Sequence, residues 1–429
     1  MPRPRPDFTN ALDRLFARGP NAPQVFPKAL FQPSAPPGAS SPGETADAGD
    51  RRQWVPRLLR SLRTLGRRQS TSVVGLDFGS SAIKLVRVDS AGGGPRVVDV
   101  ACEEYPLRLE GNAQEAFTQE RLLGFKRQGL LDGRLVIGVP NNDLSVELAT
   151  LPKMPAGDLN RAVIWEAKER IATDLSAHSI RHLVIGETSG NGQSQYEIMI
   201  VATRREGLVD QWRAFTSQGF RILAMEPAIL ALLCACETAG IWRRDEFVGV
   251  LELGRRHSTL AFLVNGMVRF IRSFPIAGDS ITQSIVDYCQ MDYEAAETQK
   301  REIGLSQMAL EEDRRVTGLE VEPRVRVSHA LGLYLERLAA EIDHSLRYLT
   351  LELGQAKDRK LDSFYLLGGG ALLKNLSAFL ASRLNARVDV ADPFRGCAIA
   401  PKAQQQLQTS PQGARLACAL GLALHPITR

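Results

Sequence analysis

Three glycine-bearing turns in this chain carry the residue types that a phosphate-binding site needs. In the first turn, a glycine lets the backbone bend so that amide N–H groups approach an oxyanion. Two serines add hydroxyl donors, a lysine adds a compact cation, and an aspartate fits holding a hydrated divalent cation that bridges phosphates. These residues are Asp77, Gly79, Ser80, Ser81 and Lys84. Taken alone the turn is a weak signal, because a plain β-hairpin explains the same residues.

The other two turns strengthen this interpretation. The second repeats the order of an acid, one residue and a glycine, and hydroxyl side chains follow it. Its residues are Glu252, Gly254, Arg255, Ser258 and Thr259. The third turn contains three successive glycines, which would let a bulky ligand approach the backbone closely. They are Gly368, Gly369 and Gly370. Three such turns in one chain indicate a nucleotide-binding cleft.

The strands around the first two turns form an internal repeat. Segments 73–89 and 248–264 each show a strand, an acid, one residue, a glycine, a polar turn and a second strand. This duplication predicts two related halves that face each other across a cleft. Elsewhere, short apolar runs alternate with helical patterns, which is typical of an α/β fold.

The predicted elements follow that alternation. Strands are expected at 71–79, 84–89, 96–102, 134–140, 145–151, 180–186, 196–203, 220–225, 247–254, 258–264, 267–274 and 387–391, with another from 362 into the triple glycine. Helices are expected at 157–172, 205–218, over most of 278–355, and at 413–424. Residues 150–225 are predicted to form an inserted small β-α-β-β-α subdomain.

Composition limits the class of protein. No stretch of the 429 residues reaches the roughly 18 unbroken apolar residues of a membrane-spanning helix, and no secretory pattern is present. The six scattered cysteines lack metal-ligand spacing and favour free thiols in a reducing compartment. We therefore expect a cytoplasmic protein. Seven arginines within 51–70 exceed the whole net charge of +5, so a general nucleic-acid-binding surface is not indicated.

The first 70 residues differ in kind from the rest. Residues 1–50 hold ten of the 23 prolines and are expected to be largely disordered. Residues 51–68 show an apolar stripe surrounded by arginines, which predicts an amphipathic helix. Such a helix can lie on an anionic membrane surface, or it can be a solvated linker. The sequence leaves both interpretations open.

The order of the motifs resembles the actin-like ATPase superfamily. The patterns are D-x-G-S-S, acid-x-G-x-x-x-S-T, G-D-x-I-T, A-E-x-x-K and L-x-G-G-G-A. Within that superfamily, the chain is most similar to the PilM family of type IV pilus assembly proteins, over about residues 71–429. The segment 150–225 resembles the extra subdomain that this family shares with the division protein FtsA. The resemblance implies a first domain from 71–149, a connecting helix at 226–247, a second domain at 248–412, and a helix at 413–429 that returns to the first domain.

The resemblance also implies roles for individual residues, with ATP and Mg²⁺ as cofactors. The first two turns become phosphate loops, the three glycines an adenosine loop, and Asp77 with Glu252 the metal site. Glu226, followed by Pro227, matches the acidic or amide residue that positions the attacking water. The residues expected to border the ribose and base are Gly278, Asp279, Thr282, Glu297 and Lys300.

One departure from the family pattern bears on catalysis. The family usually has Asp where this chain has Glu252, and an arginine pair at 255–256 replaces smaller residues. The extra methylene displaces the carboxylate by about an ångström, which is enough to alter cation geometry. We expect ATP binding with weak or absent hydrolysis. From the residues alone, Glu252 also fits a strand-end carboxylate and Glu226 a helix cap.

The function that the resemblance implies is an adaptor. It would bind the cytoplasmic tail of a PilN-like bitopic inner-membrane protein, and so lie in the cytoplasm at the periphery of that membrane. An extended tail could pair beside a strand such as 196–203, because edge strands offer unpaired amides. Two alternatives remain: an FtsA-like filament protein on the membrane, and a phosphotransferase of the sugar-kinase type. An oligomer is compatible with all three.

Overall fold

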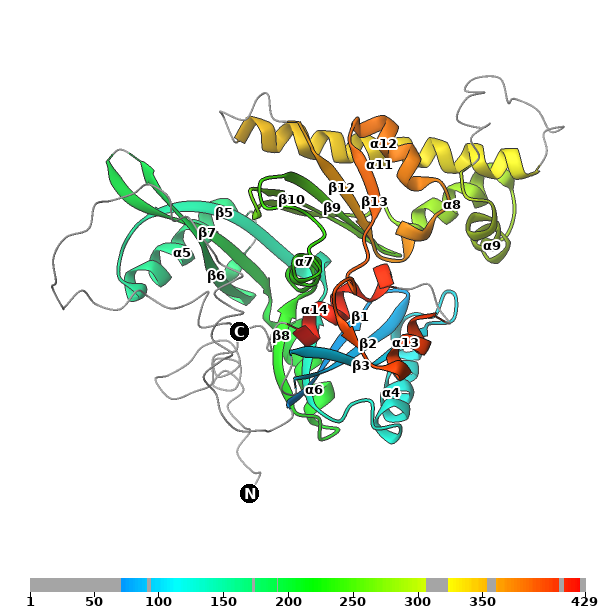
Figure 1. Cartoon of the computed structure of the whole chain (residues 1–429), viewed down its shortest axis with the longest axis horizontal. Coiled ribbons are helices and arrows are strands. Elements are labelled where there is room, and N and C mark those ends of the chain that lie inside the picture. Colours follow the sequence, from blue (N-terminus) through cyan, green and yellow to red (C-terminus); the bar gives the residue numbers. More distant parts are fainter. Residues whose placement is uncertain are drawn as a thin grey trace. The chain divides into compact units, whose positions relative to one another are not determined.

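The computed structural model describes residues 71–90, 94–171, 174–190, 192–305, 323–352, 360–408 and 413–424 (Figure 1). The tail predicted at 1–70, with its amphipathic helix at 51–68, lies outside the described residues. The described chain divides into a smaller unit, residues 145–225, and a larger unit, residues 71–144 and 226–424. None of the described helices is both long and apolar enough to cross a bilayer.

Two sheets form the framework of the larger unit. The six-stranded sheet has the order β14-β3-β2-β1-β4-β8, and the five-stranded sheet has the order β11-β10-β9-β12-β13. The first comprises β1 Thr71–Phe78, β2 Ala82–Ser90, β3 Pro95–Glu104, β4 Arg134–Val139 and β14 Ala398–Ile399, together with β8 Ile222–Pro227, of which only the last two residues belong to the larger unit. The second comprises β9 Phe247–Leu253, β10 Ser258–Val264, β11 Met267–Phe274, β12 Ser363–Leu367 and β13 Arg387–Val390.

The two sheets repeat one topology. In each, three antiparallel strands are followed by a strand that pairs in parallel with the first: β4 with β1, and β12 with β9. The two carboxylates hold matching positions in the first strands. Asp77 pairs across to Lys84, and Glu252 pairs across to Thr259. The predicted repeat of two related halves is therefore confirmed. We call the six-stranded sheet with its helices the first half, and the five-stranded sheet with its helices the second half.

Helices pack on both sheets. They are α4 Gly111–Arg127, α7 Ala228–Thr238, α8 Gly278–Cys289, α9 Tyr293–Ile303, α11 Pro323–Glu352, α12 Leu376–Leu384, α13 Pro401–Gln408 and α14 Ala417–Leu424. Short 3-10 turns occur at η2 Asn141–Asp143, η4 Gly369–Leu372 and η5 Gly413–Leu416. Sequence patterns did not predict α4, because it buries only Leu122 and Phe125 and so has no apolar stripe.

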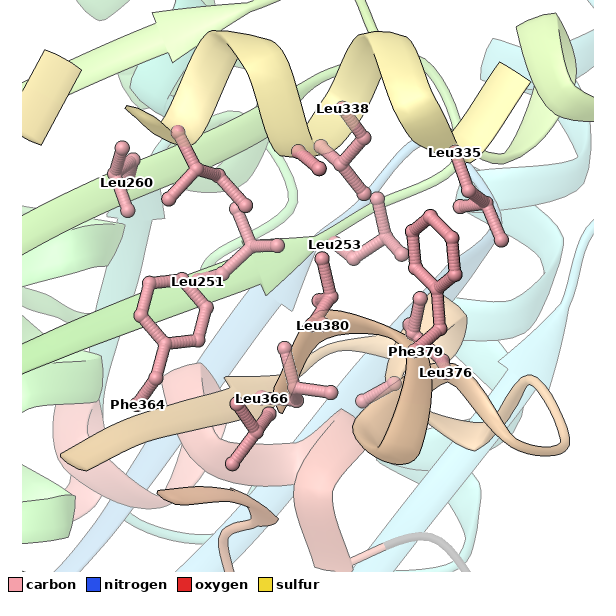
Figure 2. Packing of buried hydrophobic residues seen from close by; sticks show 14 of the residues in the cluster. Leu251, Leu253, Leu260, Leu335, Leu338, Phe364, Leu366, Leu376, Phe379 and Leu380 are labelled. Atoms are coloured by element: carbon pink, nitrogen blue, oxygen red, sulfur yellow. The ribbon is translucent and has the colours of Figure 1, made fainter. Parts of the chain in front are cut away.

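The core of the second half lies between its sheet and the long helix α11. Figure 2 shows side chains from β9, β10 and β12 meeting those of α11 and α12. The labelled members are Leu251, Leu253, Leu260, Leu335, Leu338, Phe364, Leu366, Leu376, Phe379 and Leu380. All are buried, and burying one large apolar side chain stabilises the folded state by about 1.5–3 kcal/mol. The strand that carries Glu252 is thus held firmly.

The last described helix, α14, closes the first half. It packs on β1, β2 and α7. Two glycines allow this approach: a Cβ at Gly75 would lie 2.0 Å from Ala419 O, and one at Gly421 would lie 1.8 Å from Ala231 O. Backbone meets backbone at both places, so no other residue type fits there without displacement.

The smaller unit is a three-stranded sheet with its own core. Its elements are β5 Leu144–Pro152, α5 Ala156–Arg170, η3 Leu175–Ala177, β6 His178–Gly190, β7 Gln193–Arg204 and α6 Arg205–Thr216. The side chains of Val163 and Ala167 on α5 pack against Ile198 and Ile200 on β7. The strand order is β5-β7-β6, which places 196–203 in the middle of the sheet. The expectation that this strand offers a free edge was wrong, and the edges are β5 and β6.

Candidate functional site

A cavity of about 550 Å³ lies between the two halves of the larger unit. Nine of the predicted site residues line it. They are Ser81, Gly254, Arg255, Gly278, Asp279, Glu297, Lys300, Gly369 and Gly370. The size falls within the roughly 300–1,000 Å³ that is usual for cofactor and small-molecule sites. Residues that are far apart in sequence thus meet at one concave surface.

Glycines bring the backbone of the second half close around this cavity. The Gly278 N–H donates to Gly254 O at 3.0 Å, which ties the second turn to the start of α8. Gly368 has a φ of +82°, and a Cβ there would lie 2.6 Å from Leu253 O. A Cβ on Gly370 would lie 2.3 Å from the Leu253 side chain. These positions need glycine, because a side chain would clash with the strand that carries Glu252.

The first turn holds an ion pair. Lys84 Nζ lies 2.8 Å from Asp77 Oδ2, and both side chains are buried. Burial alone would lower the pKa of Lys84, but the charge of Asp77 and its hydrogen bond to the lysine raise it above its ordinary value. The lysine therefore stays cationic, as a phosphate-binding residue must.

The second carboxylate has uncharged hydrogen-bond partners. Asn141 Nδ2 donates to Glu252 Oε2 at 2.9 Å, and Cys418 Sγ lies 3.4 Å from Oε1. Burial and the neighbouring Asp77 raise the pKa of Glu252, although Lys84 opposes this. Burial and Glu252 also raise the pKa of the Cys418 thiol well above its usual range, so Cys418 is the proton donor in this contact.

Asn141 also connects Glu252 to the helix that joins the halves. Its Oδ1 accepts from the Ile229 N–H at the start of α7 at 2.8 Å. Its main-chain oxygen accepts from Ser273 Oγ on β11 at 3.3 Å. One short polar residue after β4 thus contacts α7 and two strands of the second half.

Two polar networks line the second-half side of the cavity. In one, Asp279 Oδ1 accepts from Arg255 Nε at 2.8 Å and from Tyr293 Oη at 2.6 Å. Burial, together with this hydrogen bond, raises the pKa of Tyr293 to about 12. Tyr293 therefore remains a donor at any physiological pH. The network fixes Asp279 at the first turn of α8.

The other network lies between α8 and α9. Lys300 Nζ is 2.5 Å from Glu297 Oε2 and donates to Thr282 Oγ1 at 2.7 Å. Burial lowers the pKa of Lys300 despite Glu297. Burial alone would raise the pKa of Glu297, but Lys300 and its other partners hold it below its ordinary value. Both groups line the cavity and offer polar atoms to a ligand there.

The remaining predicted residues do not line the cavity. Ser258 Oγ donates to Ile276 O at 2.6 Å, and Thr259 Oγ1 lies 3.0 Å from Ser273 Oγ. Both hydroxyls are thus engaged in hydrogen bonds around β10. Ser80 Oγ accepts from the Arg256 N–H at 3.3 Å. Glu226 is buried at the end of β8, immediately before Pro227 and α7. The other members outside the lining are Asp77, Gly79, Lys84, Glu252, Thr282 and Gly368.

Several lining residues were missed by the sequence patterns. They are Glu104, Tyr105, Leu107, Tyr293, Thr298, Arg301, Leu372, Leu373 and Arg415. Most of them follow no glycine and belong to no motif, so spacing gave no signal for them. Asn141 was missed too, although a polar residue directly after a buried strand such as β4 is a usual place for a site residue.

Two of the acidic residues are candidates for holding a metal ion. Among the residues that the structure describes, no three His, Cys, Asp or Glu side chains are grouped as metal ligands. Mg²⁺ in nucleotide sites is commonly held by one or two carboxylates together with phosphates and waters. Asp77 and Glu252, which influence each other electrostatically, fit that smaller requirement.

Comparison with known proteins identifies the family. The model of the family described as type IV pilus assembly protein PilM matches residues 75–427. The chain belongs to the PilM family. The resemblance seen in the motifs is thereby confirmed over most of the chain.

One solved structure shows the same fold, and two others are more distantly similar. The chain is similar to a structure described as a PilM–PilN type IV pilus biogenesis complex, with 24% identity, 84% of this chain and 99% of that chain covered, and a TM-score of 0.67. It is also similar to the ethanolamine utilization protein EutJ from Carboxydothermus hydrogenoformans, at 16% identity, 86% and 95% coverage and a TM-score of 0.45. MreB5 of Spiroplasma citri bound to AMPPNP matches at 12% identity, 80% and 98% coverage and a TM-score of 0.43. The predicted actin-like fold with an inserted subdomain is confirmed for this PilM family member.

Proposed function

We propose that this chain is a cytoplasmic, ATP-binding adaptor of type IV pilus assembly. The observation that carries the ATP site is the cavity lined by glycine-bearing turns of both halves. The Ser81 hydroxyl suits a phosphate oxygen, and the glycines at 254 and 278 let a ligand approach the backbone. Lys84 is a nearby cation. Glu297 and Lys300 suit ribose hydroxyls, and Gly369 and Gly370 allow an adenosine to approach the backbone.

The same arrangement fits Mg²⁺ and weak hydrolysis. Asp77 and Glu252 would hold the ion, which neutralises phosphate charge when bound. Glu252 carries an extra methylene relative to the aspartate usual in the family, and Asn141 and Cys418 already occupy its two oxygens. Glu226 remains the candidate for positioning water, and it is buried. We propose that ATP acts mainly as a ligand that holds the two halves together.

Calorimetry tests the site. Asp77→Ala should abolish Mg²⁺-dependent ATP binding, because it removes the metal-side carboxylate and the partner of Lys84. Asp158→Ala, an exposed residue of α5, provides a matched control that should bind like the wild type. Unchanged ATP binding by Asp77→Ala would rule out this assignment. For hydrolysis, phosphate release by the wild type should stay far below the median enzyme turnover of about 10 per second.

We further propose that the partner is the cytoplasmic tail of a PilN-like bitopic membrane protein. Family membership supports this, and the fold is that of a protein whose structure is described as a complex with PilN. In the smaller unit, the edge strands β5 and β6 offer places where an extended peptide could add a strand. The protein would then lie at the periphery of the inner membrane.

A pulldown with a PilN tail peptide distinguishes this adaptor from the alternatives. The adaptor should retain the peptide in ATP and Mg²⁺ and should retain a scrambled peptide poorly. Absence of binding combined with ATP-dependent polymers on lipid would support an FtsA-like filament protein instead. Transfer of phosphate to a sugar would indicate a kinase. Deleting 1–70 should leave ATP binding intact and weaken association with anionic liposomes at low salt.

A further inference from the structure

The segment Glu104–Glu110 joins β3 to α4 and borders the cavity from the first half. Glu104 is the last residue of β3, and Glu110 immediately precedes α4. The Tyr105 N–H donates to Ser81 O at 2.9 Å, so the start of the segment is fastened to the first turn. Leu107, 38% exposed, lines the cavity together with Glu104 and Tyr105.

Glu104 contacts arginines from two other elements. Its Oε1 lies 2.6 Å from Arg415 Nη1, and its Oε2 lies 3.8 Å from Arg301 Nη1 on α9. The Arg415 side chain is only 12% exposed and lies beside Gly369, where a Cβ would be 3.9 Å from its Nε. Among the described residues, that buried Nε has no hydrogen-bond partner. Arg415 therefore depends on Glu104 for its compensating charge.

Two further contacts follow along the same segment. The guanidinium carbon of Arg108 lies 4.9 Å from the centre of the Tyr293 ring. Arg108 has a φ of +60°, a left-handed conformation that non-glycine residues adopt at a cost, which indicates that tertiary contacts hold it. Glu110 Oε1 lies 2.5 Å from Arg256 Nη2 in the second turn. Tyr293 and Arg301 line the cavity, so the contacts are spread along its rim.

We propose that Glu104–Glu110 is a strap across the cavity and that its contacts with Arg415, Arg301, Tyr293 and Arg256 retain a bound nucleotide. Glu104 is the main positioning residue, because one carboxylate contacts two arginines from different elements. The proposal rests on the ATP site proposed above. Opening the strap would then limit nucleotide exchange. Exposed ion pairs are individually weak, so removing one pair should change the rate of nucleotide exchange by about two- to tenfold. Because salt screens these pairs, raising its concentration should accelerate exchange.

The same geometry suggests an opposite role, which an experiment can separate. Glu104 could act as a counter-anion that occupies Arg415 until a phosphate displaces it. Removing the carboxylate would then strengthen nucleotide binding or speed its association. A strap predicts the reverse: faster release with little change in association.

The test uses the full-length chain loaded with mant-ATP and Mg²⁺ and chased with excess ATP in a stopped-flow instrument. Glu104→Gln should release mant-ATP about three- to tenfold faster than the wild type, and Glu110→Gln about twofold faster. Raising NaCl should accelerate release from the wild type more than from Glu104→Gln. Glu336→Gln removes an exposed ion pair with Arg383 elsewhere in the second half and should leave release unchanged.

The outcomes separate the strap from the nucleotide site. Absence of mant-ATP and ATP binding by the wild type would contradict the proposed function, and the strap with it. Binding with unchanged release in both strap variants would overturn the strap alone. Slower release or faster association in Glu104→Gln would assign Glu104 as a counter-anion. Circular dichroism checks folding; if Glu104→Gln does not fold, Glu110→Gln, whose side chain is 70% exposed, decides.

Discussion

The β1–β2 turn and the β9–β10 turn hold equivalent places in two similar sheets, yet they treat their carboxylates differently. Asp77 faces Lys84 across the strand pair, and the two form a buried ion pair. Glu252 faces Thr259, and its oxygens are held by an amide and a thiol. A repeat of backbone topology therefore does not imply a repeat of charge.

This difference gives the halves separate tasks. The first turn keeps a fixed cation near the place proposed for phosphates. The second turn keeps a carboxyl whose pKa is raised by burial and by Asp77, and whose partners come from η2 and α14 of the first half. The contacts of the second carboxylate thus depend on how the two halves are arranged. Substitutions at matched positions can test this division.

The largest effect is expected at the charged turn. Lys84→Met leaves Asp77 buried beside Glu252 without a cation, which should cost about 3–5 kcal/mol of folding free energy. Urea denaturation measures the loss. Lys402→Met is the control: this lysine pairs with buried Asp99, but it is exposed and Asp99 keeps Arg87. A loss no greater than that of the control would show that the first turn is not charge-dependent.

A carboxyl outside both turns shows how burial alone changes a pKa, without the geometry of a turn. Burial raises the pKa of Glu237 on α7 to about 7, although Arg244 opposes this. The folded protein binds this proton more tightly than the unfolded chain, so stability should fall as pH rises from about 4.5 to 7. Glu237→Gln should stabilise the protein by about 2 kcal/mol at pH 8 and by little at pH 4.5. Thermal melts across that range check this, and a gain independent of pH would contradict it.

The neutral partners of Glu252 should matter less than Lys84. Asn141→Ala removes its donor to Glu252 and the acceptor for the Ile229 N–H. Leaving these partly buried groups unpaired should cost about 1–2 kcal/mol. It should also weaken ATP binding more than Asn385→Ala, a substitution away from the cavity. Equal effects of the two variants on ATP affinity would show that Asn141 does not contribute to the ATP site.

The smallest effect is expected at the position that matches Lys84. Thr259→Val keeps the shape of the side chain and removes one hydroxyl contact with Ser273. The change should cost about 0.5–1.5 kcal/mol and leave ATP affinity unchanged, because the hydroxyl faces the framework. A large loss of ATP binding would instead place Thr259 in the phosphate loop, as its motif predicts.

Much of the framework could be predicted from the sequence. Strands such as β1, β9 and β10 are short apolar runs that end at glycine or Asn-Gly signals, and these are local features. The connecting helix expected at 226–247 is shorter in the structure, where α7 spans Ala228–Thr238. The helices α4 and α13 lack apolar periodicity, since α13 buries only Ala403.

The candidate site could be predicted where its residues fall within the motifs, which supply nine of the residues that line the cavity. At Gly254, Gly278, Gly368 and Gly370 another part of the chain approaches the backbone closely, and these glycines stand out in the sequence. Glu104, Asn141 and Arg415 act through partners more than a hundred residues away, and nothing near them in the chain shows it. The motifs also assigned Ser258 and Thr259 to phosphate, whereas strand pairing turns both hydroxyls into framework contacts.

The glycine contacts of α14 have a consequence for synthesis. β1 is among the first described elements to leave the ribosome, and α14, which covers it, is the last. Until residues 417–424 emerge, the apolar side of β1 and the surface of α7 remain exposed. The second half can bury its core before α14 emerges, whereas the first half cannot complete its core until then. Nascent chains truncated before α14 should therefore engage chaperones more strongly than chains that include it.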